Sequence, residues 1–128
     1  MTPTSRRPYF LDLFRIRFPV GAVCSFGHRV AGVILAVALP ALVYLLDRSL
    51  AGPQQYAAVV AWLHSVSGKA MLVLLAWALG HHVLAGVRHM LKDVDVGSSL
   101  TVARRSAWLA LAGGGAIALA TVALVLRA

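Results

Sequence analysis

The sequence predicts an all-α integral membrane protein with three transmembrane helices, and two observations support this: its composition and its three long uncharged stretches. The chain has 128 residues, 60% of them hydrophobic and 12% charged, and its mean hydropathy is +0.83. Soluble domains are usually about one quarter charged. We expect a single domain, residues 1–128, because a chain of this length has no room for a separate catalytic lobe.

The first predicted span covers about residues 25–47, around the uncharged stretch Val30–Leu46. A bilayer core roughly 30 Å thick needs about 20 helical residues, so this stretch must extend upstream to cross it. Residues 1–24 are expected to form a cytoplasmic segment. Arg15 and Arg17 interrupt the region where a signal peptide would have its apolar core, so we expect the first helix to stay in the mature protein.

The second and third predicted spans cover about residues 66–91 and 105–127. Their uncharged centres, Ala70–Val87 and Ala107–Leu126, are each close to the length that a bilayer requires. Three such stretches in so short a chain make buried helices of a soluble core an unattractive alternative.

Proline and glycine residues are expected to bend, interrupt or allow close packing of these helices. Pro40 should bend the first span, because it leaves the carbonyl group of Ala36 without its usual partner. Gly52-Pro53 marks a break, after which Gln54–His64 could form a short amphipathic helix at the outer interface. The glycines at 113–115 allow a neighbouring helix to approach the third span closely.

The basic residues predict the orientation of the chain. Five precede the centre of the first span, two lie between the first and second, four lie between the second and third, and one follows the third. By the positive-inside rule the N-terminus is cytoplasmic and the C-terminus periplasmic.

The net charge of +8 could suggest a nucleic-acid-binding protein. That function needs a basic face on a water-soluble body, so we predict membrane lipid and no nucleic acid as a partner. The lone cysteine, Cys24, can form neither an internal disulfide nor a metal-binding set.

Polar residues gather where the first span begins and the second ends. Consecutive spans are antiparallel, so these ends lie at the same membrane depth and can meet. On the second span, the spacing of His82, Gly86, His89 and Asp93 places them along one helix face. Ionisable groups inside a membrane are costly and usually functional.

Three interpretations of His82 stay open on these residues alone. Its imidazole could bind haem iron, relay protons, or hydrogen-bond across a helix interface. Haem binding is favoured by Gly86, which leaves space for a flat ligand, and by cationic groups nearby that could neutralise propionates. Those groups are His28, Arg29, Arg88 and His89. We expect His81 to be an interface or lipid-edge residue and His64 to be solvated in the outer loop.

The chain resembles the cytochrome b556 membrane subunit family of succinate dehydrogenase through nearly its whole length. The resemblance is carried by the Ser25-Phe26-Gly27-His28-Arg29 segment with Gly32, and by the segment from His82 through Gly86, Arg88 and His89 to Asp93. Earlier motifs, Arg7-Pro8, Leu11-Asp12-Leu13 and Ile16-Arg17-Phe18-Pro19, also match. Ala31 and Lys92 depart from the usual family residues.

The resemblance implies a role for each matching residue. It implies that His82 is the axial ligand of haem b, that Gly86 packs against the haem, and that His28, Arg29 and His89 lie near its propionates. It implies that Ser25 and Arg29 line a quinone site and that Asp93 assists proton entry.

The same resemblance implies a set of partners and a cellular role. A second membrane-anchor subunit would pack against this chain and supply the other haem histidine. A flavoprotein with FAD and an iron–sulfur subunit would pass electrons from succinate to this anchor and on to quinone, in the tricarboxylic acid cycle and aerobic respiration. This chain has no dinucleotide fingerprint and one cysteine, so no activity is expected from it alone. The expected location is a bacterial inner membrane.

Two alternatives remain from the sequence. A small proton-coupled transporter could use His82 and Asp93 as a relay, although the chain has no Glu and its four Asp residues lie outside the apolar stretches. A haem-free anchor of the same complex would use the histidines only to pack helices.

Overall fold

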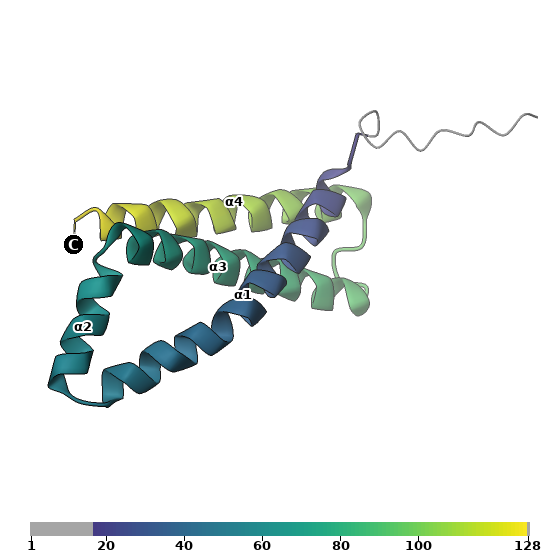
Figure 1. The fold of residues 1–128 in the computed structure, drawn as a ribbon. Coiled ribbons are helices and arrows are strands. Elements are labelled where there is room, and N and C mark those ends of the chain that lie inside the picture. The colour runs from purple at the N-terminus through teal and green to yellow at the C-terminus, as the bar shows by residue number, and fades with distance from the viewer. Residues whose placement is uncertain (1–16, 128) are drawn as a thin grey trace, which may run out of the picture.

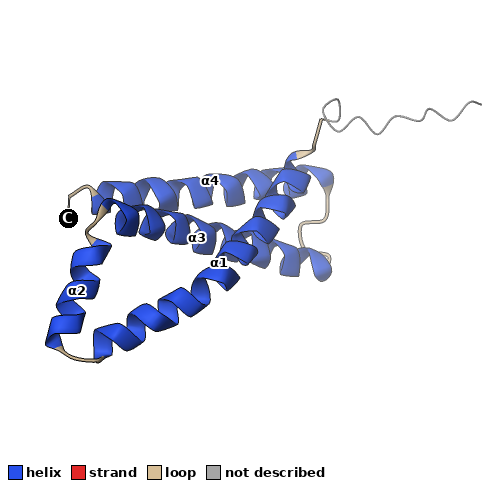
Figure 2. Cartoon of the chain, viewed as in Figure 1, coloured by secondary structure: helices blue, strands red, loops and turns tan. Residues whose placement is uncertain are grey.

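The computed structural model describes residues 17–127, and this part of the chain is almost entirely helical (Figure 2). It contains α1 (Val20–Leu50), α2 (Pro53–Leu63), α3 (Val66–Asp93) and α4 (Leu100–Val125). The three long helices, α1, α3 and α4, are each long and apolar enough to span a membrane. The prediction of an all-α membrane protein with three spans is therefore confirmed.

Helices α3 and α4 lie side by side and antiparallel, and α1 crosses them at an angle (Figure 1). Small residues occupy part of the α3–α4 contact, where Ala85 of α3 packs with Ala107 and Ala110 of α4. Small side chains let helix backbones approach, which is how membrane helices gain packing energy without a hydrophobic driving force between them.

The buried residues of α1 all lie in its first half. Its buried residues are Cys24 and Ala31, whereas the positions beyond them are mostly exposed. The helix changes direction near its middle, and its second half diverges from α3 (Figure 1). Pro40 lies inside this helix, and the sequence predicts a bend at this residue.

Helix α2 joins the far ends of α1 and α3 (Figure 1). It begins at Pro53, a favoured first helical residue, after Gly52 turns the chain with a φ of 149°. The predicted helix at Gln54–His64 is thus present, one residue displaced at each end. The hydroxyl of Ser65 then caps α3 by accepting a hydrogen bond from the backbone N–H of Gly68 at 3.2 Å.

Two spans begin earlier than their predicted cores. α1 starts at Val20 and α4 at Leu100, so Arg29, Arg104 and Arg105 all lie within helices. Arginine is compatible with a helix that continues into the headgroup region, because its long side chain can reach the interface. The charged residues therefore mark the edge of the apolar core and not the end of the helix.

Candidate functional site

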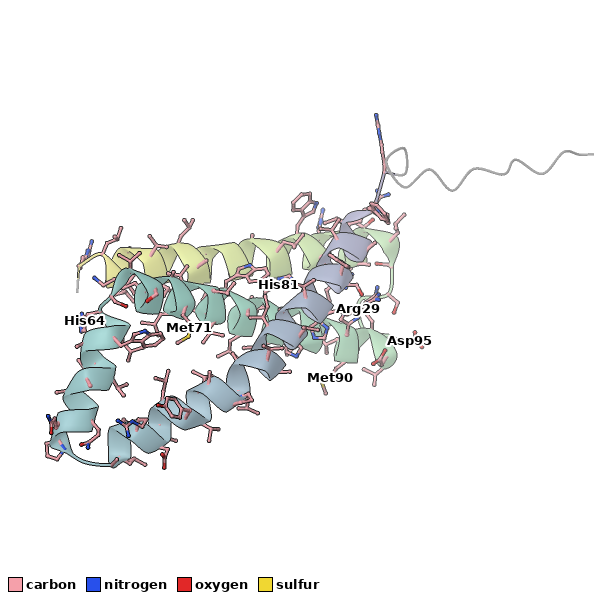
Figure 3. All side chains as sticks on the ribbon, viewed as in Figure 1. Arg29, His64, Met71, His81, Met90 and Asp95 are labelled. Carbon is pink, nitrogen blue, oxygen red and sulfur yellow. The ribbon has the colours of Figure 1, made fainter. Side chains whose placement is uncertain are left out.

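The polar residues of α3 separate into two stripes on different helix faces. One stripe contains His82, Gly86 and His89 and lies against α1 at His28. The other contains His81 and Arg88 and lies against α4. The predicted meeting of the α1 and α3 polar sets occurs where these helices cross, and Figure 3 labels His81 and Arg29 in this region.

The ring of His82 is held by the backbone of α1. Its Nδ1 lies 3.1 Å from the carbonyl oxygen of His28. Because a carbonyl oxygen can only accept, Nδ1 must carry the proton, and in the neutral ring Nε2 then bears a lone pair. Among the described residues Nε2 has no hydrogen-bond partner, and it is not one of the fully buried unpartnered atoms, so it reaches the surface of the chain.

His28 stacks on the face of His82. The ring centroids are 4.1 Å apart and the planes are within 10° of parallel. The lone pair of Nε2 lies in the plane of its ring, so a neighbour stacked on the face does not block it. His89 lies at the other side of His28, with centroids 5.3 Å apart and a tilt of 53°. The three imidazoles form a continuous group, which we call the histidine cluster.

Two glycines make this packing possible. A Cβ on Gly32 of α1 would lie 3.0 Å from Cε1 of His82, and a Cβ on Gly86 of α3 would lie 3.3 Å from Nε2 of His28. Each helix thus presents a glycine to the histidine of the other. The ring of His28 thus packs beside Gly86, and the expectation that Gly86 leaves space for a flat ligand stays a prediction.

The residues nearer the water differ in exposure. Arg29 and Asp93 are exposed, whereas Ser25 is half-buried. Arg29 lines a cavity of about 420 Å³ with Phe18, Ala22, Val23 and Phe26. Ser25 is about 40° from Arg29 around the helix, on the side toward His28, which follows from 100° per residue. Arg29 therefore borders the apolar cavity, and Ser25 lies between His28 and Arg29 around α1.

His81 is the most buried of the histidines in the described part of the chain, at 1% exposure. It stacks in parallel with Trp77, and its Nδ1 lies 3.4 Å from the carbonyl oxygen of Ala110, a long contact for a hydrogen bond. Its Nε2 is fully buried without a partner and faces Gly27 of α1. The expected interface position is correct, but sequence reasoning missed that this ring forms the centre of the bundle.

Arg88 is the one expected member that the structure directs away from the histidine cluster. Its guanidinium turns toward α4, where Nε donates to the Ser106 hydroxyl at 3.1 Å and Nη2 donates to the Ala103 carbonyl at 3.2 Å. It is 7% exposed, so it is not the interfacial anchor that an arginine at a helix end usually is. Position 88 is seven residues from 81, so it shares the face of His81 and not that of His82.

No group of three or more His, Cys, Asp or Glu side chains within residues 17–127 has the geometry to hold a bare metal ion. The histidine cluster therefore offers a single imidazole with a directed lone pair, and further basic groups around it.

Comparisons with known proteins agree with these features. The family model for the succinate dehydrogenase/fumarate reductase transmembrane subunit matches residues 3–124. The succinate dehydrogenase cytochrome b556 subunit of Coxiella burnetii is 33% identical over 105 residues, covering 81% of this chain and 84% of that one. The subunit of the same name from Paracoccus denitrificans is 28% identical over 116 residues, covering 91% and 89% respectively.

Proposed function

This chain belongs to the succinate dehydrogenase/fumarate reductase transmembrane subunit family, and we propose that it binds haem b and passes electrons to quinone within that complex. As a multi-pass membrane subunit of an oxidoreductase family, it would anchor the soluble subunits at the bilayer. The observation that carries the proposal is the hydrogen bond from Nδ1 of His82 to the carbonyl oxygen of His28.

That hydrogen bond prepares His82 as an iron ligand. Metal-binding histidines usually donate their second ring N–H to a backbone carbonyl or a carboxylate, which fixes the ring and makes the ligating nitrogen more basic. His82 makes this bond from Nδ1, and its Nε2 is accessible and in the plane of the ring. Haem bound there would supply reversible one-electron storage at its iron. The residues present fit the group.

The surrounding basic residues suit the acidic groups of haem. Its propionates are anions that need compensation at the edge of the membrane. His28 and His89 belong to the histidine cluster, and Arg29 follows His28 on the exposed side of α1. We assign these three residues to the propionates. We also propose that Gly86 packs against the haem, beside the ring of His28.

The quinone site would use the cavity beside Arg29. The cavity walls from Phe18, Ala22, Val23 and Phe26 suit a lipophilic ring, and the Arg29 guanidinium can donate to a quinone carbonyl oxygen. The Ser25 hydroxyl can donate to the same oxygen. Both donors favour reduction, because they stabilise the negative charge that grows on that oxygen. Asp93, exposed at the end of α3, would deliver protons from the water.

The remaining chemistry would come from partner subunits. The diverging second half of α1 exposes large apolar side chains, including Val37, Leu39, Val43 and Leu46, on which a second membrane subunit could pack. That subunit would supply the second haem histidine. FAD and iron–sulfur clusters would lie in the flavoprotein and the iron–sulfur subunit, because this chain has one cysteine. We place the complex in a bacterial inner membrane, with the N-terminus of this chain cytoplasmic.

The ligand assignment is tested by reduced-minus-oxidised spectra of the purified complex. His82→Ala should remove or strongly perturb the b-type absorption bands. His64→Ala, which changes an exposed histidine after α2 at the opposite end of the bundle, should leave them unchanged. An unchanged spectrum in His82→Ala would reject the assignment. A wild-type complex without haem absorption would favour a haem-free anchor.

The quinone assignment is tested by comparing two electron acceptors. Arg29→Ala and Ser25→Ala should lower the rate with a quinone analogue by about 10²-fold or less, and should leave succinate oxidation with a water-soluble dye unchanged. Arg48→Ala, in the last turn of the same helix, is the matched control. Equal losses with both acceptors would indicate a defect in assembly and would contradict the assignment.

A further inference from the structure

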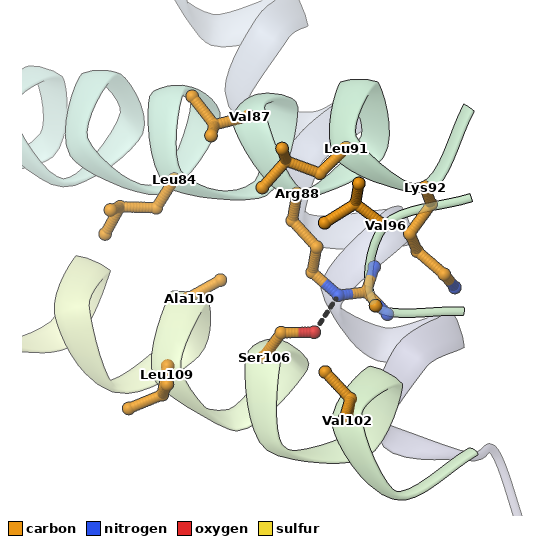
Figure 4. Close-up of a pocket in the computed structure, with 11 residues that line it drawn as sticks. Leu84, Val87, Arg88, Leu91, Lys92, Val96, Val102, Ser106, Leu109 and Ala110 are labelled. Atoms are coloured by element: carbon orange, nitrogen blue, oxygen red, sulfur yellow. Dashed lines mark hydrogen bonds between the residues drawn. The ribbon is translucent and has the colours of Figure 1, made fainter. Parts of the chain in front are cut away.

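A second cavity lies between α3 and α4, on the far side of α3 from the histidine cluster. It encloses about 280 Å³ near the connection between these helices. Figure 4 shows its composition: aliphatic side chains form most of the wall, and Arg88, Lys92 and Ser106 supply the polar atoms. The aliphatic residues include Leu84, Val87, Leu91, Val96, Val102 and Leu109.

Arg88 brings a buried positive charge to this cavity. Its hydrogen-bond partners, the Ser106 hydroxyl and the Ala103 carbonyl, are both neutral. Within residues 17–127 no carboxylate forms an ion pair with it. A guanidinium has five N–H donors, so at least three remain. A charge at 7% exposure in a membrane helix is costly until an anion compensates it.

Lys92 adds a second cation to the same wall. It is half-buried and lies one helical turn beyond Arg88 on α3. The nearby carboxylates Asp93 and Asp95 are exposed and do not line the cavity. The potential inside the cavity is therefore positive.

Polarity in the cavity follows depth along α3. Leu84, Arg88 and Lys92 are spaced by four residues, or about 6 Å per step. Leu84 lies toward the middle of the span and Lys92 toward its end. Both cations therefore lie at the end of the cavity nearer the membrane edge, among Leu91, Val96 and Val102, while the deeper wall at Leu84 and Leu109 is aliphatic. A phospholipid has the same order, with an acyl chain inside the bilayer and a phosphate at its edge.

We propose that this cavity binds one anionic phospholipid from the adjacent leaflet, which is the cytoplasmic one in the predicted orientation. Its phosphate lies between Arg88 and Lys92, and one acyl chain follows the aliphatic wall past Leu84 and Leu109. A zwitterionic phospholipid would bring the same phosphate together with an ammonium group that the two cations repel. A quinone would leave both cations uncompensated, and a free phosphate would leave the aliphatic wall unfilled. The bound lipid contacts both α3 and α4 and thereby stabilises their packing.

The test uses the complete complex, purified with its native partners, stripped of lipid and then titrated with phosphatidylglycerol in detergent. Phosphatidylglycerol should raise Tm with saturation and remain bound to this chain in native mass spectrometry. Phosphatidylcholine of the same acyl composition and inorganic phosphate should do neither. An equal response to phosphatidylcholine would overturn the proposed charge recognition, and an equal response to inorganic phosphate would overturn the lipid.

Variants locate the site on α3. Lys92→Gln removes one cation that makes no internal hydrogen bond in the described residues, so it should fold normally and raise the half-saturating phosphatidylglycerol concentration about fivefold. Arg88→Gln should raise it further if the complex assembles. Lys69→Gln, a half-buried lysine at the opposite end of α3, is the matched control. Equal effects of Lys92→Gln and Lys69→Gln would refute the site.

Discussion

Replacing Gly32 with alanine tests how the crossing of α1 and α3 prepares His82. The new Cβ would lie 3.0 Å from Cε1 and 3.3 Å from Nδ1 of His82, whereas ordinary van der Waals contact begins near 3.4 Å. The ring must therefore retreat by about 0.4 Å. Its hydrogen bond to the His28 carbonyl would lengthen from 3.1 Å toward the outer limit of a hydrogen bond.

The size of the effect follows from two opposing terms. A stretched hydrogen bond in a membrane protein loses about 0.6–1 kcal/mol, while alanine in a helix gains up to about 1 kcal/mol over glycine. Stability of the bundle should therefore change little. The main effect should be weaker haem binding. Removing the hydrogen bond made by the second ring nitrogen of a metal-bound histidine lowers metal affinity by about 10- to 100-fold. A bond that is stretched and not deleted should cost about tenfold.

The assay is the transfer of haem from the purified complex to excess apomyoglobin, with reduced-minus-oxidised spectra recorded in parallel. Gly115→Ala is the control, because nothing lies within 4 Å of its added Cβ and it measures the helix-propensity gain alone. We expect Gly32→Ala to lose haem about tenfold more readily than Gly115→Ala. Equal retention in the two variants would refute the coupling between Gly32, the His82 hydrogen bond and iron binding.

Two further predictions concern packing and helix shape. Gly27→Ala should destabilise the complex by about 1–3 kcal/mol in thermal unfolding, because its Cβ would lie 2.7 Å from the buried ring of His81. Gly113→Ala should be tolerated, because its Cβ would meet only the tip of the partly exposed Leu84 side chain. A smaller effect from Gly27→Ala than from Gly113→Ala would contradict the central position of His81. Pro40→Ala should straighten α1, measured by spin-label distances across the bend, without altering the haem spectrum, since Pro40 is exposed and distant from the cluster. Unchanged distances would rule out proline as the cause of the bend.

Much of the fold could be predicted because a bilayer leaves few alternatives. An uncharged stretch of nearly 20 residues must form a helix that satisfies its own backbone. The helix ends were harder to predict. The predicted spans, about 25–47 and 105–127, already include Arg29 and Arg105, but α1 and α4 begin still earlier, at Val20 and Leu100. Hydropathy reports the thickness of the lipid core, while the helix continues until its backbone meets a cap or a turn.

The two faces of α3 show which part of the site the sequence does not determine. A period of 3.6 residues groups His82 with His89 and groups His81 with Arg88. It does not say which group meets α1 and which meets α4. The sequence therefore predicts Arg88 near the haem propionates, whereas the structure places it with His81 against α4.

The sequence by itself determined that this chain crosses a membrane three times, which family it belongs to, and which histidines share a face of α3. Those properties depend on hydropathy and on helical periodicity, both of which are local along the chain. Only the tertiary structure decided that the carbonyl of His28 fixes the ring of His82, that His28 packs beside Gly86, and that Arg88 is buried against α4. Each of these depends on the angle at which α1 crosses α3, which small residues such as Gly27, Gly32 and Gly86 jointly set through close backbone approach.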